Sequence, residues 1–400
     1  MNATPARSAI GAAKAVPGRL TRPLIWLARI LTIALALLLL LLAASMDRNW
    51  ANRHMLYDIL VANSWLMTVL QTERLLLAAA AMTLLLVVYP RIGLLAAKVR
   101  AARGAGRWVG IGAALLLALP ASEGAIRLAT GRTGQAWSPF NEPLRRSDPL
   151  LGWVNIPSRE AVDPDYASRP VYVIDRNGYR IAAGSLFDAT SPAVLFAGES
   201  IMFGKGLNWP DTIAGQIEAT SGVKSANMAV AAYSTGQTYL QLKRELPKFR
   251  HPLAIVILFG PSLMIRDLDK NRPWIDRVGN WHPARGAWHL THLKRVLFPY
   301  HSSAAIDEAV AADRHILIAQ VAMARARGTE PLILVPVFQP EPPQQHALRA
   351  AIFDGAAIPH VVVPLDQNWR LSPDSHPDAR AHAAMAAAVW TRLKGRFFVE

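Results

Sequence analysis

Ser200 stands where a serine could act as a nucleophile. It follows an apolar run, residues 194–197, and Gly198, which together are typical of a buried strand that ends in a sharp turn. This pattern predicts that Ser200 lies at the carboxyl end of a strand, where ligands and reacting groups collect in open α/β sheets. The plainer interpretation is that Ser200 only caps the next helix.

The glycines around Ser200 do not form a phosphate-binding P-loop. That loop needs four residues between its first glycine and a Gly-Lys pair, which Ser or Thr must then follow. Here five residues separate Gly198 from Gly204, and Lys205 is followed by Gly206. The spacing therefore excludes a P-loop.

A candidate base lies at the other end of the chain, in residues 373–378, directly before the strongly helical stretch 379–396. A serine is unreactive at its own pKa, so a neutral imidazole must take its proton as it attacks an ester carbonyl. His376 is the candidate base, and Asp374 is the candidate acid that orients the imidazole and stabilises the imidazolium. Asp378 is interpreted as the N-cap of the last helix.

Together these two motifs resemble those of SGNH hydrolases, also called the GDSL family of lipases and esterases, in the branch found on bacterial envelope proteins. The matching residues are Gly198, Glu199 and Ser200 in the first block and Asp374, His376 and Pro377 in the last. The resemblance covers about residues 148–400. In many members the acid lies three residues before the histidine, where this chain has Pro373, so Asp374 is the candidate instead.

The resemblance also implies an oxyanion hole. Its first donor is the backbone N–H of Ser200. Ala232 stands where the second block has a glycine whose N–H donates, and an alanine serves there if its φ is negative. Ser262 stands where the third block has an asparagine whose side chain donates, and it is a shorter, weaker donor. These two departures put full hydrolytic strength in doubt.

The order of patterns after Ser200 predicts the fold class. The predicted strands are 225–230, 253–259, 332–337 and 360–363, and the predicted helices are 210–220, 236–246, 304–327, 344–353 and 379–396. Strands that alternate with helices imply a mostly parallel sheet covered on both faces, in a three-layer α/β/α sandwich. The resemblance implies the same α/β class, with a flavodoxin-like sheet, for a hydrolase domain over residues 191–400.

Residues 131–190 are predicted to form a linker and a small β lead-in. The stretch 131–144 is polar with Pro and Gly, which is typical of a linker. Alternation around Val171, followed by Asn177 and Gly178, predicts a β-hairpin. No chemistry is assigned to this region.

Residues 1–130 are predicted to be a membrane region with about three transmembrane helices. Residues 24–46 form a long apolar run whose only charge, Arg29, lies near its start. A cleavable signal peptide is the alternative, but this run exceeds the roughly 7–15 apolar residues of a signal core. The further predicted spans are 75–97 and 108–127.

Basic residues predict the orientation of these helices by the positive-inside rule. The N-terminal tail and the connection between the second and third spans each carry four: Arg7, Lys14, Arg19 and Arg22, then Lys98, Arg100, Arg103 and Arg107. Both segments are expected in the cytoplasm. Three crossings then place the C-terminal domain in the periplasm or at the cell exterior, on a multi-pass protein of a bacterial inner (plasma) membrane.

The charge distribution argues against a nucleic-acid partner. Lys and Arg outnumber Asp and Glu by 43 to 28, but residues 1–136 carry a net charge of +11 and residues 137–400 only +4. The excess of basic residues therefore lies mainly in the hydrophobic N-terminal third of the chain, residues 1–136. Lys205 and the charges in 266–272 are interpreted as a solvated face.

Metal ions and cofactors are not expected. The chain has no Cys, which excludes disulfides and thiolate metal sites. His289 and His292 lie three residues apart near His282, but no third ligand is spaced to complete a site. An aromatic loop that stacks on sugars and a plain shielded loop are both open interpretations of this segment.

These patterns predict an extracytoplasmic, membrane-anchored serine esterase or O-acyltransferase that works through an acyl-serine. The resemblance implies acetyl esters of a cell-envelope or exported polysaccharide as substrate class, with the lipid bilayer and polysaccharide-assembly proteins as partners. The alternative is a catalytically impaired module of the same fold that binds a glycan or such a partner.

Overall fold

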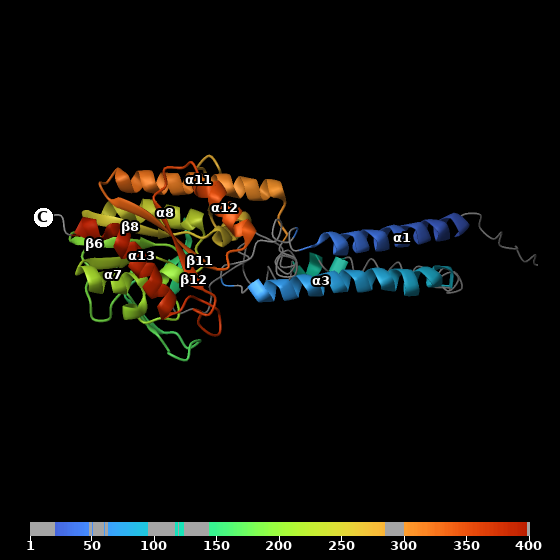
Figure 1. The fold of residues 1–400 in the computed structure, drawn as a ribbon, viewed down its shortest axis with the longest axis horizontal. Helices are drawn as coiled ribbons and strands as arrows, with labels where there is room; N and C mark the ends of the chain where they lie inside the picture. Colours follow the sequence, from blue (N-terminus) through green and yellow to red (C-terminus); the bar gives the residue numbers. More distant parts are fainter. Residues whose placement is uncertain are drawn as a thin grey trace, which may run out of the picture. The chain divides into compact units, whose positions relative to one another are not determined.

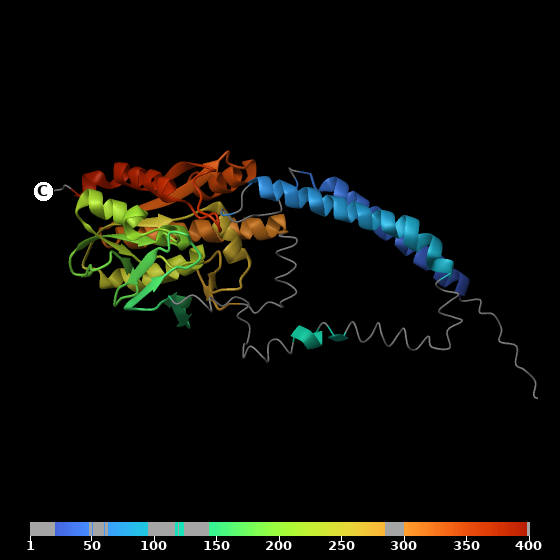
Figure 2. The ribbon, with the colours of Figure 1, turned by 90° about the horizontal axis from the view of Figure 1, so that it is seen from below.

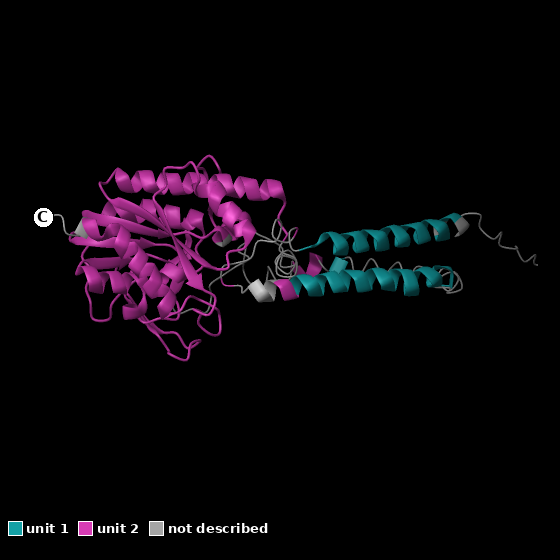
Figure 3. Ribbon diagram, in the orientation of Figure 1, with its two compact units in different colours: residues 1–47, 69–119 teal, residues 48–68, 120–400 magenta. Residues whose placement is uncertain are grey.

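The computed structural model describes residues 21–47, 50, 60, 63–94, 117–118, 120–123, 144–284 and 300–397. The chain divides into two compact units (Figure 3). One contains residues 1–47 and 69–119, and the other contains residues 48–68 and 120–400.

The first unit contains two long apolar helices that lie side by side (Figures 1 and 2). α1 spans Thr21–Ser45, and α3 spans Asn63–Thr83 and continues through the π-helical turn Leu84–Val88 to residue 94. The Arg74 Nε atom donates to the Ala43 carbonyl at 2.9 Å, which ties the two helices together.

Both helices are long and apolar enough to cross a membrane, over Ile25–Ser45 and Met67–Leu94. The second begins eight residues before the predicted start at 75. The third predicted span, 108–127, falls mainly outside the described residues, of which 117–118 and 120–123 are helical. A protein with three spans and an external C-terminal domain remains a prediction.

In its described residues from 144 to 397, the second unit holds twelve strands and seven α-helices. The strands are β1 (Arg145–Asp148), β2 (Gly152–Asn155), β3 (Arg159–Val162), β4 (Val171–Ile174), β5 (Arg180–Ile181), β6 (Pro192–Ala197), β7 (Lys224–Asn227), β8 (His251–Leu258), β9 (Trp274–Ile275), β10 (Trp281–His282), β11 (Glu330–Gln339) and β12 (His360–Asp366). The helices are α6 (Ser200–Phe203), α7 (Ile213–Ser221), α8 (Thr235–Glu245), α9 (Met264–Leu268), α11 (Ser303–Arg325), α12 (Pro343–Phe353) and α13 (Ala379–Phe397).

Eight of these strands form one sheet in the order β12-β11-β8-β6-β7-β5-β4-β3. The five strands from β12 to β7 are parallel, which confirms the predicted α/β class with a mostly parallel sheet. β3, β4 and β5 extend the sheet antiparallel beyond β7. The predicted hairpin is the β4–β5 pair, so this part of the lead-in belongs to the main sheet, whereas β1 and β2 form a separate two-stranded sheet.

Alternate residues of the central strands build the two cores of the sandwich. On β6, Leu195 packs with residues of α8, α11 and α12, whereas Val194 and Phe196 pack with residues of α7 and α13. These are the two helical layers on either face of the sheet (Figure 1). Because β6 is covered on both faces, its sequence is apolar throughout and not alternating.

Two acidic side chains are buried near one another, Asp313 on α11 and Asp267 on α9. Asp313 is fully buried, and Asp267 on α9 accepts the backbone N–H groups of Thr235 and Gly236. Burial, and then the negative charge of Asp267, raise the pKa of Asp313 well above its ordinary value. The folded state therefore keeps a proton that the unfolded chain loses near pH 4.

We predict that Asp313→Asn stabilises the protein above about pH 4. The folded wild type binds more protons than the unfolded chain in this range, so its stability falls as pH rises, and the neutral Asn lacks this slope. Urea unfolding between pH 4 and 8 should show a gain of more than about 1 kcal/mol at pH 8, shrinking toward pH 4. Parallel pH profiles would contradict this. Asp307→Asn, at an exposed position of the same helix, is the control.

Candidate active site

The strand order positions Ser200. From β6 the chain first goes to its neighbour β7 and then returns past β6 to β8 on the other side. The carboxyl end of β6 is therefore the point where the winding of the sheet reverses, which leaves a crevice between the connections on either side. Ser200 is the first residue of α6, which begins three residues after β6 ends.

The turn into α6 depends on Gly198 and Glu199. Gly198 has a φ of 154°, and a Cβ atom there would lie only 3.0 Å from the Cβ atoms of Leu258 and Met202. Glu199 is the N-cap, because its Oε1 atom accepts the Ile201 N–H at 3.0 Å. Ser200 is thus not the capping residue, and its side chain is left for other contacts.

The three predicted catalytic residues lie together, although 174 residues separate Ser200 from Asp374. The His376 Nε2 atom lies 2.8 Å from the Ser200 Oγ atom. On the other side of the ring, Nδ1 lies 2.7 Å from an Asp374 carboxylate oxygen. Ser200 and His376 are only 5% exposed, so the serine and imidazole sit in a largely dry environment. This order of serine, imidazole and carboxylate is the arrangement that nucleophilic acyl transfer needs.

Asp374 stays ionised over the working pH range. Burial alone would raise its pKa, but contact with the His376 ring, the charge of that ring and a hydrogen bond from the Tyr166 hydroxyl outweigh burial and lower the pKa to about 2. Lys205 Nζ lies 3.9 Å from the same carboxylate. A charged carboxylate is the form that can hold the imidazole by its Nδ1 side and stabilise an imidazolium.

Two residues to which the sequence analysis gave no catalytic role, Glu199 and Arg266, contact the serine or its neighbour. The Ser200 hydroxyl also lies 2.5 Å from the Glu199 carboxylate, and Arg266 NH1 lies 3.2 Å from the same carboxylate oxygen. Arg266 donates to the Tyr233 carbonyl as well, at 3.0 Å. The interpretation of this charge as part of a solvated face is wrong, because Arg266 forms an ion pair with a buried acid. The serine hydroxyl thus has two acceptors, His376 and Glu199.

The candidate oxyanion donors are backbone groups at two turns. Within the described part of the chain, the N–H groups of Ser200 and Ala232 donate to no protein acceptor, as an oxyanion hole requires. Ala232 has a φ of +66°, so the condition of a negative φ is not met. Ser262 lies in the short turn Pro261–Leu263, and the position of its side chain lies outside the described structure.

Carbonyl contacts hold Ala232 in its strained conformation. Arg145 NH1 donates to the Ala231 carbonyl at 2.8 Å, and the Trp153 indole donates to the same oxygen at 3.1 Å. Arg272 NH1 donates to the Ala232 carbonyl at 2.5 Å. The carbonyls of Ala231 and Ala232 are thus both held by hydrogen bonds, which help to maintain the left-handed φ of Ala232.

A buried arginine from the lead-in holds the turn after Ser200. Arg180 is fully buried on β5 and donates to the carbonyls of Phe203, Gly204 and Leu207 at 2.6, 2.8 and 2.6 Å. Burial lowers its pKa to about 10, so it remains charged at neutral pH. The region to which the sequence assigned no chemistry therefore fixes the loop that follows the candidate nucleophile.

The segment that contains His282, His289 and His292 is only partly described. His282 Nε2 lies 3.0 Å from Asp276, and the His282 ring stacks on Trp274 with centroids 4.2 Å apart. His289 and His292 lie outside the described residues. Among the residues that the structure describes, no group of three or more His, Cys, Asp or Glu side chains is arranged to hold a metal ion.

Comparison with known proteins yields structural neighbours alone, because no family model and no curated protein matches the chain. A member of the lipolytic protein G-D-S-L family from Veillonella parvula is 10% identical, over 51% of this chain and 99% of that chain, with a TM-score of 0.31. An acetyl xylan esterase from the rumen bacterium Butyrivibrio proteoclasticus is 10% identical, over 54% and 67%, with a TM-score of 0.33.

A carbohydrate acetylesterase family member from Sinorhizobium meliloti is 14% identical, over 52% of this chain and 100% of that chain, with a TM-score of 0.31. These three structural neighbours are thus a G-D-S-L lipolytic protein and two carbohydrate esterases.

We predict that Ala232→Gly stabilises the protein. A left-handed φ costs an alanine about 1–2 kcal/mol, which glycine avoids. Glycine also gives the unfolded chain more conformational freedom, which offsets part of this stabilisation. Urea unfolding should show a net gain of about 0.5–1 kcal/mol. Ala231→Gly, next to it but without a positive φ, should instead lose stability. Equal losses in both variants would contradict the strain at Ala232.

Proposed function

We propose that this protein is a serine esterase or O-acyltransferase that forms an acyl-enzyme on Ser200. The observation that carries the proposal is the continuous contact from the Ser200 hydroxyl through the His376 ring to the ionised Asp374 carboxylate. A serine hydroxyl must lose its proton as it attacks, and in this arrangement a base lies 2.8 Å from Oγ to accept that proton.

In the acylation step, Ser200 Oγ attacks the ester carbonyl carbon while His376 Nε2 takes the hydroxyl proton. The negative charge moves to the former carbonyl oxygen, which the N–H groups of Ser200 and Ala232 stabilise. One such donor is worth about 2.7–4 kcal/mol in enzymes where it has been removed. The bond to the leaving alcohol then breaks, and His376 returns the proton to the alcohol oxygen.

In the second step a water molecule or an acceptor hydroxyl attacks the acyl-serine. His376 again takes the attacking proton, and Ser200 Oγ leaves and receives it back. Hydrolysis and transfer differ only in which hydroxyl reaches the carbonyl carbon. Asp374 acts in both steps by holding the ring and stabilising its charged form.

Glu199 gives the resting serine a second hydrogen-bond acceptor. When the hydroxyl donates to Glu199, it is turned away from the base, so the productive state requires it to rotate toward His376. Arg266 neutralises the Glu199 carboxylate and lowers its strength as an acceptor. The Glu199–Arg266 pair thus sets how readily the nucleophile is available.

The substrate and location complete the proposal. Esters of an envelope or exported polysaccharide follow from the motif resemblance, and the external position follows from the positive-inside prediction. The two apolar helices are the support for a membrane anchor. Together these features describe an anchored enzyme that acts on material at the outer side of the inner membrane.

We predict that Ser200→Ala and His376→Ala abolish activity without unfolding the protein. The full-length protein is tested with p-nitrophenyl acetate and with a serine-directed fluorophosphonate probe. Each variant should lose at least about a thousandfold in kcat, and Ser200→Ala should not be labelled. Circular dichroism checks that both variants fold.

Asp378→Ala is the matched control, two residues from His376. The Asp378 Oδ1 atom accepts the N–H groups of Arg380 and Ala381, so its loss removes a helix cap worth about 0.5–2 kcal/mol and leaves turnover intact. Folded wild type that neither labels nor turns over esters would contradict the proposal and favour a binding module of the same fold.

A further inference from the structure

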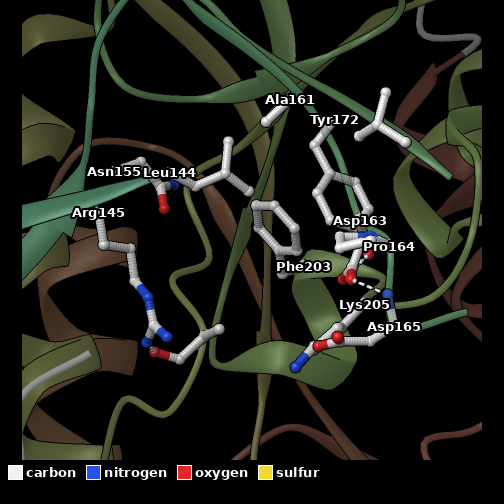
Figure 4. A pocket seen from close by; sticks show the side chains of 12 residues that line it. Leu144, Arg145, Asn155, Ala161, Asp163, Pro164, Asp165, Tyr172, Phe203 and Lys205 are labelled. Atoms are coloured by element: carbon white, nitrogen blue, oxygen red, sulfur yellow. Dashed lines mark hydrogen bonds between the residues drawn. The ribbon is translucent and has the colours of Figure 1, made fainter. Parts of the chain in front are cut away.

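A cavity of about 250 Å³ is lined by residues that follow Ser200 in the chain and by residues of the lead-in (Figure 4). The lead-in forms one part of its wall, through Leu144, Ala161 and Val162, and the turn after Ser200 forms another, through Phe203 and Lys205. Phe203 follows Ser200 within α6, and Lys205 Nζ lies 3.9 Å from Asp374. The lining also includes Ala231, the neighbour of the candidate oxyanion donor Ala232.

Most of the side chains in the lining are apolar. Phe203 lies in the middle of the cavity wall in Figure 4 and packs edge-on against Tyr172, with ring centroids 5.2 Å apart. Both rings are 3% exposed. Val162 is 43% exposed, which is high for a large apolar side chain on a strand. Such a lining favours a hydrocarbon group over a polar one.

Three polar side chains of the lining, those of Arg145, Asn155 and Asp163, already form hydrogen bonds within the protein. Asn155 Nδ2 donates to the carbonyls of Gly178 and Ala229. The Asp163 carboxylate accepts the Tyr172 hydroxyl and the Asp165 N–H, and Arg145 donates to the Ala231 carbonyl. A sugar ring, whose hydroxyls need partners, would have to compete with these bonds. An apolar chain would leave them in place.

We propose that this cavity holds the acyl chain of the substrate, and that the chain is longer than acetyl. This inference rests on the proposed function and specifies the acyl half of its substrate. The cavity lies just below the roughly 300–1,000 Å³ of pockets that bind drug-sized ligands, so it suits one chain of medium length. The motif resemblance implied acetyl esters, and the cavity extends this to acyl groups such as butyryl and hexanoyl.

The test compares p-nitrophenyl acetate, butyrate and hexanoate on the full-length protein in lipid nanodiscs. Each added methylene that enters the cavity should raise kcat/KM about fourfold, the equivalent of about 0.8 kcal/mol. Ala161→Leu, which fills the cavity from β3, should lower the hexanoate-to-acetate ratio of kcat/KM at least tenfold. Val162→Phe is a second variant. Val162 is more exposed, so the larger side chain does not have to fit into the packed core.

Glu160→Leu is the matched control. It adds the same side chain at the preceding, exposed residue of β3, which is not part of the lining, and should leave the ratio unchanged. The proposal would be overturned if the wild-type hexanoate-to-acetate ratio of kcat/KM is near one. It would also be overturned if both cavity variants leave that ratio unchanged. If the variants instead alter transfer to methyl glucoside and not the chain-length ratio, the cavity is an acceptor subsite and the acyl-chain proposal is wrong.

A binding measurement separates this proposal from the proposed function. Octanoate is titrated by NMR into Ser200→Ala, which cannot form an acyl-enzyme, with and without Ala161→Leu. Binding that Ala161→Leu weakens at least tenfold supports the chain site even if no ester is hydrolysed, in which case the esterase proposal alone fails. If octanoate does not bind and acetate is hydrolysed normally, the acyl-chain proposal alone fails.

Discussion

The hydrogen bonds of the Arg180 guanidinium are the constraint on which the rest of the site depends. A charged side chain with no solvent exposure is costly unless hydrogen bonds replace water, and here three carbonyls of the turn after Ser200 do so. Those carbonyls are thereby fixed, and with them the direction of α6 and of the serine on it. The rings of Tyr172 and Phe203 lie 4.6 and 4.9 Å from the same guanidinium.

The lead-in strands contribute more to the site than their place before the parallel sheet suggests. β5 carries Arg180, and the loop before β4 carries Tyr166, whose hydroxyl donates to the triad acid. Gly206 makes this approach possible, since a Cβ atom there would lie 2.7 Å from the Tyr166 ring. The turn after Ser200, the Asp374 carboxylate and part of the cavity wall thus all contact a segment that a parallel α/β domain does not need for its own sheet.

Local sequence was sufficient for the parallel strands and for the serine, histidine and aspartate that the fold brings into contact. β6 and β8 are continuous apolar runs because both faces are covered, and Ser200 and His376 each sit in a short recognisable motif. The contacts of Arg180 and Arg266 were not predictable, because each partner lies at least 23 residues away and nothing in a single charged residue shows that it is buried. The φ of Ala232 is set by Arg145, Trp153 and Arg272, again from distant segments.

The central claim is that an acyl group is carried on Ser200, and trapping that intermediate tests it most directly. The full-length protein is mixed with p-nitrophenyl butyrate, quenched in acid within one turnover and digested for peptide mass spectrometry. We expect the mass of one butyryl group on the peptide that carries Ser200, and no such mass in the His376→Ala variant. Continued turnover with no adduct, or an adduct on another residue, would contradict the account.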